Sequence, residues 1–589
     1  MHSEAFLRRW PLRAAGFLVA ALWAVASPAQ AVPPAKNVIV LIADGCSAEQ
    51  YTFARWFKGA PLSFDPCRVG AVQTYIADSV IADSAPAASA FATGVRTSDK
   101  FISVGPHANT LAGVPVPPEG LRYRPVATVL EGARLLKKST GIVATSRVTH
   151  ATPAAYVAHT ASRANEDDIM EQAVYQGLDV VFGGGRRHLI PRELKGRRAD
   201  GENLYERLKG WGYRIVENRR ELEKADSPRV FGMFAPSHMD PEIDRPRQHP
   251  DQPTLAEMTR KAIEILSRDR DGFFLMVEGS QVDWACHAND PAYLLSDLLA
   301  YDQAVAAALE FAKKDGRTLV LAMSDHNTGG FSIGNQASNG IYPQMKVEAF
   351  LDPFRRMQAS SVRMWELIDP DKTAARVKAV IKEGWTLDLA DEDAQKILAL
   401  AAAYKESAYH AIGEVLSPKY TYVGWTTHGH CGGDVPLHAF GPGRPGGVLE
   451  APELARVCAA AMGFDLQKLS ERLFVEAAQA FPAGRVAVDR RDPANPVVTI
   501  AAGGRTAELP ANKPIEPTAA PLRLAIVVVH QRELLLRAPG RGAAAAHRQP
   551  VGRTPASPAL RLIAGPMADG RKTSHRGARP EAEGAFANG

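Results

Sequence analysis

The 589-residue chain has few cysteines, no apolar run long enough to anchor it in a membrane, and little net charge. An odd total of five cysteines means that disulfides cannot pair all of them. The apolar stretch 14–25 is too short to cross a bilayer as a permanent anchor. Of the net charge of +5, residues 1–31 carry +2 and residues 515–589 carry +6, which leaves −3 for residues 32–514. This balance argues against a nucleic-acid partner.

Residues 1–31 have the pattern of a cleavable export signal. Three arginines precede the apolar stretch, and Ala29-Gln30-Ala31 is a small-x-small cleavage site, so we expect cleavage after Ala31. The pair Arg8-Arg9 is also a loose match to a twin-arginine signal. We therefore predict a periplasmic or secreted protein without a stable membrane anchor.

Continuous apolar runs predict strands that are buried on both faces. These runs are Asn37–Ala43, Gly141–Ala144, Gly272–Val277 and Thr318–Met323. Helical patterns such as Pro291–Lys313 separate them. The alternation predicts an α/β fold with a mostly parallel central sheet that is flanked by helices on both faces. In such sheets, ligands bind beyond the carboxyl ends of the strands.

The pattern changes twice along the chain. Between Gly329 and Tyr420 it becomes helices and loops without a clear buried strand, so we interpret 330–420 as an inserted, cap-like or crown-like region near the site. Residues 32–514 form the main domain, and 515–589 form a tail rich in alanine, arginine and proline. Disorder is one interpretation of this tail. The other is a frameshift that replaced the native C-terminal strand.

One serine, Ser84, lies between an acid and the start of an alanine-rich helix. Pro86 fits the first turn of a helix, where its missing N–H is not needed. The backbone N–H groups at such a helix start favour an anion, and a hydroxyl there can attack a phosphate that they hold. Ser84 could also be a simple N-cap. The neighbouring motifs decide between these interpretations.

Carboxylates and imidazoles gather at the ends of the predicted strands and on one predicted helix. Asp283 and His287 are four residues apart, so on a helix they share a face and can chelate one ion. Carboxylate and imidazole ligands together suit Zn²⁺, whereas carboxylate and hydroxyl oxygens suit Mg²⁺. Taken singly, each candidate could be a helix cap, a surface histidine or half of an ion pair. The candidates are Asp44, Thr152, Arg163, Glu278, Asp283, His287, Asp325, His326 and His430.

In this order and at these positions, the motifs resemble those of the alkaline phosphatase family from about Asn37 to Pro442. The resemblance implies that Ser84 is the nucleophile and Arg163 the phosphate clamp. It also implies two zinc ions and one magnesium ion. The implied ligands are Asp283, His287 and His430 for the first zinc, Asp44, Asp325 and His326 for the second, and Asp44, Thr152 and Glu278 for magnesium. The resemblance also favours His430 over His428, because His430 precedes Gly441-Pro442 by the spacing that the family has.

Two positions depart from the best-known bacterial pattern of the family, and Cys431 is a smaller difference. His150 stands where that pattern has an acid, and Trp284 stands where it has a lysine. These two residues leave the identity of the third metal open. Cys431, where threonine is common, lies beside a metal ligand, as do Cys46 and Cys286. A disulfide among these three cysteines is an open alternative.

The resemblance implies hydrolysis of phosphate monoesters through a phosphoserine at Ser84, with inorganic phosphate as a product and a homodimer as the assembly. A phosphodiesterase, a phosphomutase or a sulfatase of the same superfamily is the nearest alternative. Sulfatases need their own modifiable Cys or Ser motif, which is absent around Ser84, and diesterases generally lack the third metal and the arginine clamp. A catalytically silent, exported metal-binding protein is the alternative from another class.

Overall fold

The computed structural model describes residues 35–114, 117–476, 479, 481–512, 527–529 and 534–537. The predicted export signal, and all of the predicted tail except 527–529 and 534–537, lie outside this part. In the part that is described, no helix combines the length and the apolar character needed to cross a membrane.

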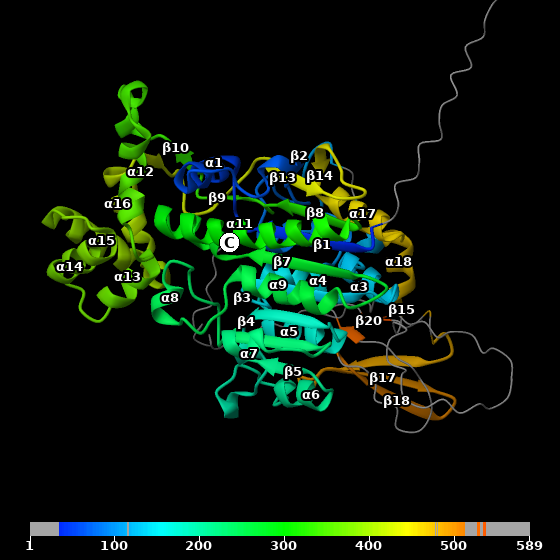
Figure 1. Ribbon diagram of the computed structural model, residues 1–589. Coiled ribbons are helices and arrows are strands. Elements are labelled where there is room, and N and C mark those ends of the chain that lie inside the picture. Colours follow the sequence, from blue (N-terminus) through cyan, green and yellow to red (C-terminus); the bar gives the residue numbers. More distant parts are fainter. Residues whose placement is uncertain are drawn as a thin grey trace, which may run out of the picture. The chain divides into compact units, whose positions relative to one another are not determined.

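A ten-stranded, mostly parallel sheet forms the centre of the fold (Figure 1). From one edge to the other, its strands are β14 (Gly447–Glu450), β2 (Arg68–Gln73), β13 (Val435–Phe440), β8 (Thr318–Met323), β1 (Asn37–Ala43), β7 (Phe273–Gly279), β3 (Ser139–Arg147), β4 (Val180–Gly184), β6 (Val230–Ala235) and β5 (Arg214–Val216). Strand β13 alone runs antiparallel to its neighbours, β8 and β2. The predicted fold class is confirmed.

The sheet has a hydrophobic core on each face, and strand β1 contributes to both, because its successive side chains point to opposite faces. Ile39 and Leu41 join one core, and Val40 and Ile42 join the other. Helices that pack into the first core include α1 (Ala48–Lys58), α9 (Leu255–Leu266) and α11 (Pro291–Asp315). Helices that pack into the second include α2 (Ser84–Thr93), α3 (Val129–Leu135), α4 (Ala151–Val157), α5 (Glu166–Gln176), α6 (Leu204–Gly210), α17 (Ala451–Met462) and α18 (Leu466–Leu473).

Helix α11 illustrates why the local sequence folds as it does. The carboxylate of Asp290 accepts hydrogen bonds from the backbone N–H groups of Ala292 and Tyr293, each at 3.0 Å. Pro291 occupies the first turn, and Gly316 ends the helix with a left-handed φ of 69°. Both residues suit those positions. The predicted helix over 291–313 therefore exists and is two residues longer.

The carboxyl ends of three adjacent strands bring acidic residues together. Strand β1 lies between β7 and β8 and is parallel to both. Asp44 follows β1 directly, Glu278 is the penultimate residue of β7, and Asp325 comes two residues after β8. All three side chains are fully buried. The sheet thus places three carboxylates at one edge, away from water.

The region between Gly329 and Tyr420 is mainly helical, as predicted. Its helices are α12 (Val347–Arg356), α13 (Ser361–Ile368), α14 (Ala374–Trp385), α15 (Asp391–Tyr404) and α16 (His410–Tyr420). The short strand β10 (Ser332–Ile333) in this region is exposed and pairs with β11 (Val423–Gly424). Near the end of the chain, β16 (Arg485–Asp489), β17 (Val497–Ala502) and β18 (Arg505–Pro510) form a separate antiparallel sheet.

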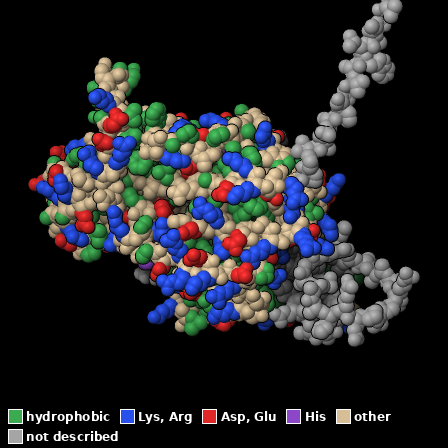
Figure 2. Space-filling model, viewed as in Figure 1, with side chains coloured by type: hydrophobic (Ala, Val, Ile, Leu, Met, Phe, Trp, Pro, Cys, Tyr) green, Lys and Arg blue, Asp and Glu red, His purple; other side chains and the backbone are tan. Residues whose placement is uncertain are grey.

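Two short strands fall within the predicted tail. Strands β19 (Val527–Val529) and β20 (Leu534–Arg537) pair with each other, and β20 pairs with β15 (Phe474–Glu476). On the described surface that Figure 2 presents, positive and negative side chains are interspersed. That distribution agrees with the near-neutral charge of the main domain.

Candidate active site

Ser84 is the first residue of α2, and the N-cap position before it belongs to Asp83. Ser84 is fully buried, and its Oγ lies 3.0 Å from Nε2 of His326. The same hydroxyl donates to Oδ1 of Asp44 at 3.5 Å. Ser84 therefore does not cap the helix, and its hydroxyl points to the carboxyl edge of the sheet.

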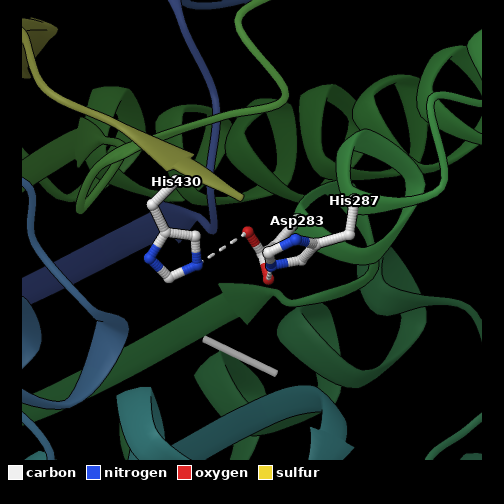
Figure 3. Close-up of side chains that lie close together, drawn as sticks. All are labelled: Asp283, His287 and His430. Carbon is white, nitrogen blue, oxygen red and sulfur yellow. Dashed lines mark ion pairs between the residues drawn. The ribbon is translucent and has the colours of Figure 1, made fainter. Parts of the chain in front are cut away.

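The first candidate metal group comprises Asp283, His287 and His430 (Figure 3). Asp283 and His287 lie on α10 (Gln281–His287), and His430 begins the short strand β12 (His430–Cys431). The Nε2 atom of His287 lies 3.2 Å from Oδ2 of Asp283, and Nε2 of His430 lies 3.8 Å from Oδ1 of the same carboxylate. Two chain segments that are far apart in sequence thus meet at one carboxylate.

The second candidate group comprises Asp44, Asp325 and His326. The Nε2 atom of His326 lies 3.4 Å from Oδ1 of Asp44 and 3.5 Å from Oδ2 of Asp325. The N–H of Gly45 donates to Oδ1 of Asp325 at 3.2 Å, which leaves Oδ2 turned toward the group. The backbone turn after β8 is what allows the adjacent Asp325 and His326 to face one point.

The third candidate group joins Asp44 and Glu278 to His150, the N-cap residue of α4. The sequence analysis placed His150 near the third metal but assigned the ligand role to Thr152. The Thr152 hydroxyl is buried and finds no hydrogen-bond partner in the part of the chain that the structure describes. The ring of His150 packs edge-on against Trp284, with 5.3 Å between ring centroids. Both departures from the bacterial pattern therefore meet at this group.

Two of the imidazoles are fixed in the tautomer that a metal needs. Nδ1 of His287 donates to the carbonyl of His428, and Nδ1 of His430 donates to the carbonyl of Ala82 at 2.8 Å. In the neutral form that binds a metal, an imidazole has one donor and one acceptor nitrogen, so Nε2 then carries the lone pair in both rings. Second-layer contacts of this kind orient histidine ligands in metal sites.

The hydrogen bonds of the Thr328 hydroxyl determine the tautomer of His326. Thr328 donates that proton to Oδ1 of Asp283 at 2.6 Å, so its oxygen can only accept from Nδ1 of His326, 3.2 Å away. Nε2 of His326 therefore also carries a lone pair, and it faces Ser84. Thr328 connects the first and second groups, a role that no sequence motif indicated.

Several buried polar atoms in these groups lack a hydrogen-bond partner, which indicates whether metal ions would fit there. Buried polar groups are nearly always hydrogen-bonded, so each exception needs a reason. Among the described residues, the unpartnered atoms include Oδ2 of Asp44, Nδ1 of His150, Oγ1 of Thr152, Oε1 of Glu278, Nε2 of His287, Oδ2 of Asp325 and Nε2 of His430. Nδ1 of His150 carries the ring proton while Nε2 accepts from Arg163. The other six atoms fit the donor sets of zinc and magnesium.

The raised pKa values of the buried carboxylates also indicate that the site accommodates metal cations. Burial, followed by repulsion from Asp325 and Asp283, raises the pKa of Asp44 well above its usual value. Burial, with Asp283, raises the pKa of Asp325 to about 7, and burial raises the pKa of Glu278 to about 7. Like charges in a dry site cannot all ionise unless cations compensate them. Divalent cations would supply that compensation.

Arg163 contacts Asp83, the residue before Ser84, and is held by two side chains and one carbonyl. Its Nη1 donates to Oδ1 of Asp83, and its Nη2 donates to Nε2 of His150 at 2.9 Å. Its backbone N–H donates to the carbonyl of Lys100 at 2.9 Å. Burial lowers the pKa of Arg163, but Asp83, Asp44 and Asp283 outweigh burial and raise it. The guanidinium therefore stays charged next to Ser84.

Sequence reasoning missed the role of Asp83. It recognised an acid before Ser84 but assigned it no function, whereas its carboxylate orients Arg163. It also missed Ser146, whose hydroxyl donates to Oε2 of Glu278 at 3.1 Å. The adjacency of Asp83 to Ser84 was the one available signal. Ser146 had none, because its neighbour lies on another strand.

The helical region after Gly329 borders the site. Nε2 of His428 lies 3.0 Å from Oε2 of Glu414, which belongs to α16. The ring of His428 takes no part in a candidate metal group of the described residues, although its carbonyl orients His287. All five cysteines lie in the described part of the chain and are free thiols. The structure thus contains no disulfide beside the metal groups.

Together, the parallel sheet, the buried serine at a helix start, the three carboxylate–imidazole groups and the arginine define a metal-dependent hydrolase of anionic esters. The comparisons with known proteins make the class specific. The model of the alkaline phosphatase family matches residues 35–464, and the chain belongs to this family. It is therefore a phosphoric monoester hydrolase that acts on small phosphomonoesters.

Several relatives share most of their length with this chain. Alkaline phosphatase 3 of Bacillus subtilis is 34% identical over 449 residues, which cover 73% of this chain and 90% of the relative. Repressible alkaline phosphatase of Saccharomyces cerevisiae is 31% identical over 457 residues, which cover 69% and 76%. These names agree in assigning phosphatase activity to both relatives.

Solved structures share the fold. The alkaline phosphatase of Thermus thermophilus aligns with a TM-score of 0.63 and 27% identity, over 74% of this chain and 92% of that one. A mutant of the alkaline phosphatase from the Antarctic bacterium TAB5, with aspartate in place of histidine and Mg bound in the M3 site, aligns with a TM-score of 0.52 and 26% identity. That alignment covers 74% of this chain and 99% of the mutant chain.

Proposed function

We propose that this protein is an alkaline phosphatase that hydrolyses phosphate monoesters through a phosphoserine at Ser84, with two zinc ions and one magnesium ion. The observation that carries the proposal is the position of the Ser84 hydroxyl. It faces Nε2 of His326 at 3.0 Å, beside a cluster of buried ligand atoms that lack partners among the described residues. A buried nucleophile next to candidate metal ligands favours metal-assisted attack on an ester.

The chain's own residues account for two displacements at phosphorus. Arg163 holds two non-bridging oxygens of the phosphoryl group with its planar fork. The bond from Ser84 Oγ to phosphorus forms while the ester P–O bond breaks, and the alcohol leaves. Water then attacks phosphorus, the bond to Oγ breaks, inorganic phosphate leaves, and Ser84 regains its proton. Bound metal ions supply positive charge that lowers the pKa of the serine hydroxyl and stabilises the leaving oxygen.

We assign zinc to the two groups that combine carboxylates with the fixed imidazoles. Asp283, His287 and His430 would hold one zinc, and Asp44, Asp325 and His326 would hold the other. Asp44, Thr152 and Glu278 would hold magnesium, with Asp44 bridging two ions. His150 complicates the third site, because a neutral imidazole has a single lone pair. It can accept from Arg163 or ligate a metal, but it cannot do both.

The variant His150→Asp should shift the third site toward magnesium. Burial, with Arg163 and Arg147, lowers the pKa of His150 to about 3, so the residue is a neutral nitrogen donor in the native protein. A carboxylate would add a hard oxygen ligand and keep an oxygen for Arg163. We expect the Mg²⁺ concentration for half-maximal activation to fall. The TAB5 mutant with Mg in its M3 site supports this expectation. An unchanged Mg²⁺ titration would contradict it.

The variant Arg163→Ala should weaken phosphate binding and slow turnover together. We expect the inhibition constant for inorganic phosphate to rise. We also expect kcat/KM to fall by the factor that corresponds to a loss of about 2–4 kcal/mol of transition-state stabilisation, as for the loss of one preorganised donor. Arg163→Lys should restore little of this, because an ammonium cannot hold two oxygens in a plane. If phosphate inhibited Arg163→Ala as strongly as the native protein, Arg163 would not be the clamp.

Hydrolysis of p-nitrophenyl phosphate at alkaline pH tests the proposed function. The signal-free protein would be assayed with Zn²⁺ and Mg²⁺, and again after chelation. Turnover that disappears on chelation and returns with metal would support the proposal. Faster turnover of bis-p-nitrophenyl phosphate than of the monoester would favour a phosphodiesterase. Tight metal binding by a folded protein with no turnover of either ester would favour a silent metal-binding protein.

The remaining expectations concern the context of the enzyme. We propose that it is an exported homodimer, with residues 1–31 as the signal, 32–514 as the catalytic domain and 330–420 as an inserted region beside the active site. The family membership supports this organisation. For 515–589, the alternatives remain disorder and a frameshift. Resequencing the gene and finding the reading frame intact would rule out the frameshift.

A further inference from the structure

Lys100 has a backbone conformation that lysine rarely adopts. Its φ of 64° lies in the left-handed region, which costs a residue with a side chain about 1–2 kcal/mol and costs glycine almost nothing. The carbonyl of Lys100 accepts the backbone N–H of Arg163 at 2.9 Å, so this conformation contributes to the position of the phosphate clamp. A glycine would satisfy the backbone equally well. Lysine therefore adds at this position a side chain that the backbone conformation does not need.

The ammonium of Lys100 reaches the carboxylate that orients the clamp. Its Nζ lies 3.6 Å from Oδ2 of Asp83, whose Oδ1 accepts from Arg163. Burial raises the pKa of Asp83, but Arg163 and then Lys100 outweigh burial and lower it. Nζ also lies 3.7 Å from Asp99, but both partners of that pair are about half exposed, so it contributes little. Lys100 is thus a second cation at the residue that precedes the nucleophile.

Exposure increases from the nucleophile toward Lys100. Ser84 is fully buried, the side chain of Arg163 is 14% exposed, and the side chain of Lys100 is 47% exposed. A substrate whose phosphoryl group reaches Ser84 and Arg163 must extend its alcohol portion toward solvent. A long, flexible lysine at the exposed end of this series can contact that portion. The contact would be electrostatic, because the lysine presents a positive charge.

We propose that Lys100 is a specificity-determining residue that favours phosphomonoesters whose alcohol portion carries a further negative charge, such as a carboxylate or a second phosphate. This inference rests on the proposed function. It explains why a strained lysine occupies a position that suits glycine. It also separates the role of Lys100, recognition of the alcohol portion, from that of Arg163, recognition of the transferred phosphoryl group.

Two matched substrates test the proposal. 3-Carboxyphenyl phosphate carries the extra charge, and 3-carbamoylphenyl phosphate has the same shape without it. The measured quantity is the ratio of their kcat/KM values at pH 9 and low salt, compared between variants so that intrinsic reactivities cancel. Lys100→Gln should lower this ratio by a factor between about 1.4 and 5, the range for an exposed charge pair. Lys100→Arg should retain it, and added salt should weaken it in the native protein.

A second lysine in the same conformation controls for backbone strain. Lys195 has a φ of 65° and is exposed, and it is not among the residues placed at the site. Lys100→Gly and Lys195→Gly should both relieve strain and raise the thermal midpoint slightly. Only Lys100→Gly should also lower the substrate ratio. The pair therefore separates the effect of backbone relief from the effect of the lost ammonium.

The outcomes distinguish this inference from the proposed function. If Lys100→Gln hydrolysed both esters with the native ratio, the inference would be wrong while the phosphatase function stood. An equal loss for both esters would also overturn it, because Lys100 would then act only through the phosphoryl group. If the metal-loaded native protein hydrolysed neither ester, nor p-nitrophenyl phosphate, the proposed function itself would fail.

Discussion

Replacing Ser84 with alanine should reduce kcat for p-nitrophenyl phosphate by roughly 10³-fold or more, as expected for the loss of a covalent nucleophile. The hydroxyl is the only part of Ser84 that the variant removes, and in the native protein it lies 3.0 Å from Nε2 of His326. Arg163 and the metal ligands remain, so metal content and phosphate inhibition should change little. The variant should fold normally, because alanine suits a helix.

A second serine on the same helix provides the control. Ser89 is also fully buried in α2, but its hydroxyl donates to the carbonyl of Phe101 at 3.3 Å and has no contact with the metal groups. Ser89→Ala should lower stability while turnover stays within a few-fold of native. Native enzyme quenched in acid during turnover should retain covalent phosphate, and Ser84→Ala should retain none. Turnover of Ser84→Ala within tenfold of native would exclude Ser84 as the nucleophile.

Strands that are buried on both faces could be predicted most accurately. The bounds of β1 and β8 agree with the sequence prediction to the residue, because both are continuous apolar runs. The prediction for β3 covered only 141–144, whereas the strand spans Ser139–Arg147. Its extra residues are all polar, and contacts with residues far away in the sequence hold them in the strand. The hydroxyl of Ser139 donates to Asp269 at 2.7 Å, and the backbone N–H of Thr140 donates to Asp179 at 2.9 Å.

Most candidate ligands could be proposed from the sequence because they sit in short motifs at a strand end or on one helix face. The contacts that orient these ligands could not, because they join residues far apart in sequence. Thr328 connects Asp283 to His326, and the carbonyl of Ala82 fixes the tautomer of His430. The contact of Asp83 with Arg163 likewise depends on the loop that carries Lys100. These are tertiary relations, which spacing along the chain does not encode.

Glu278→Gln should have opposite effects on the stability of the metal-free and the metal-loaded protein. In the metal-free protein, burial raises the pKa of Glu278 from 4.5 to about 7. A carboxyl group whose pKa is higher in the folded than in the unfolded state favours folding below the unfolded pKa. That contribution is lost as pH rises from about 4.5 through about 7. Glutamine resembles the protonated acid and carries no charge, so it avoids this loss.

The expected result follows from the sign of that shift. At pH 8, metal-free Glu278→Gln should be more stable than the metal-free native protein, by up to about 3 kcal/mol at 1.36 kcal/mol per pKa unit. Near pH 4.5 the two should be equal. The other titratable groups are common to both proteins, so the comparison isolates residue 278. In the metal-loaded protein at pH 8, the variant should be the less stable one, because it has lost a charged ligand.

Denaturant unfolding at pH 4.5 and pH 8, with chelator or with Zn²⁺ and Mg²⁺, measures all of these differences. Glu383→Gln is the matched control, since it removes the same charge from an exposed position on α14 and should change neither form. If the metal-free variant matched the native protein at pH 8, Glu278 would not be a strained carboxylate. The reversal between the two forms is specific to a ligand, because a buried acid with only a structural role would be affected equally with and without metal.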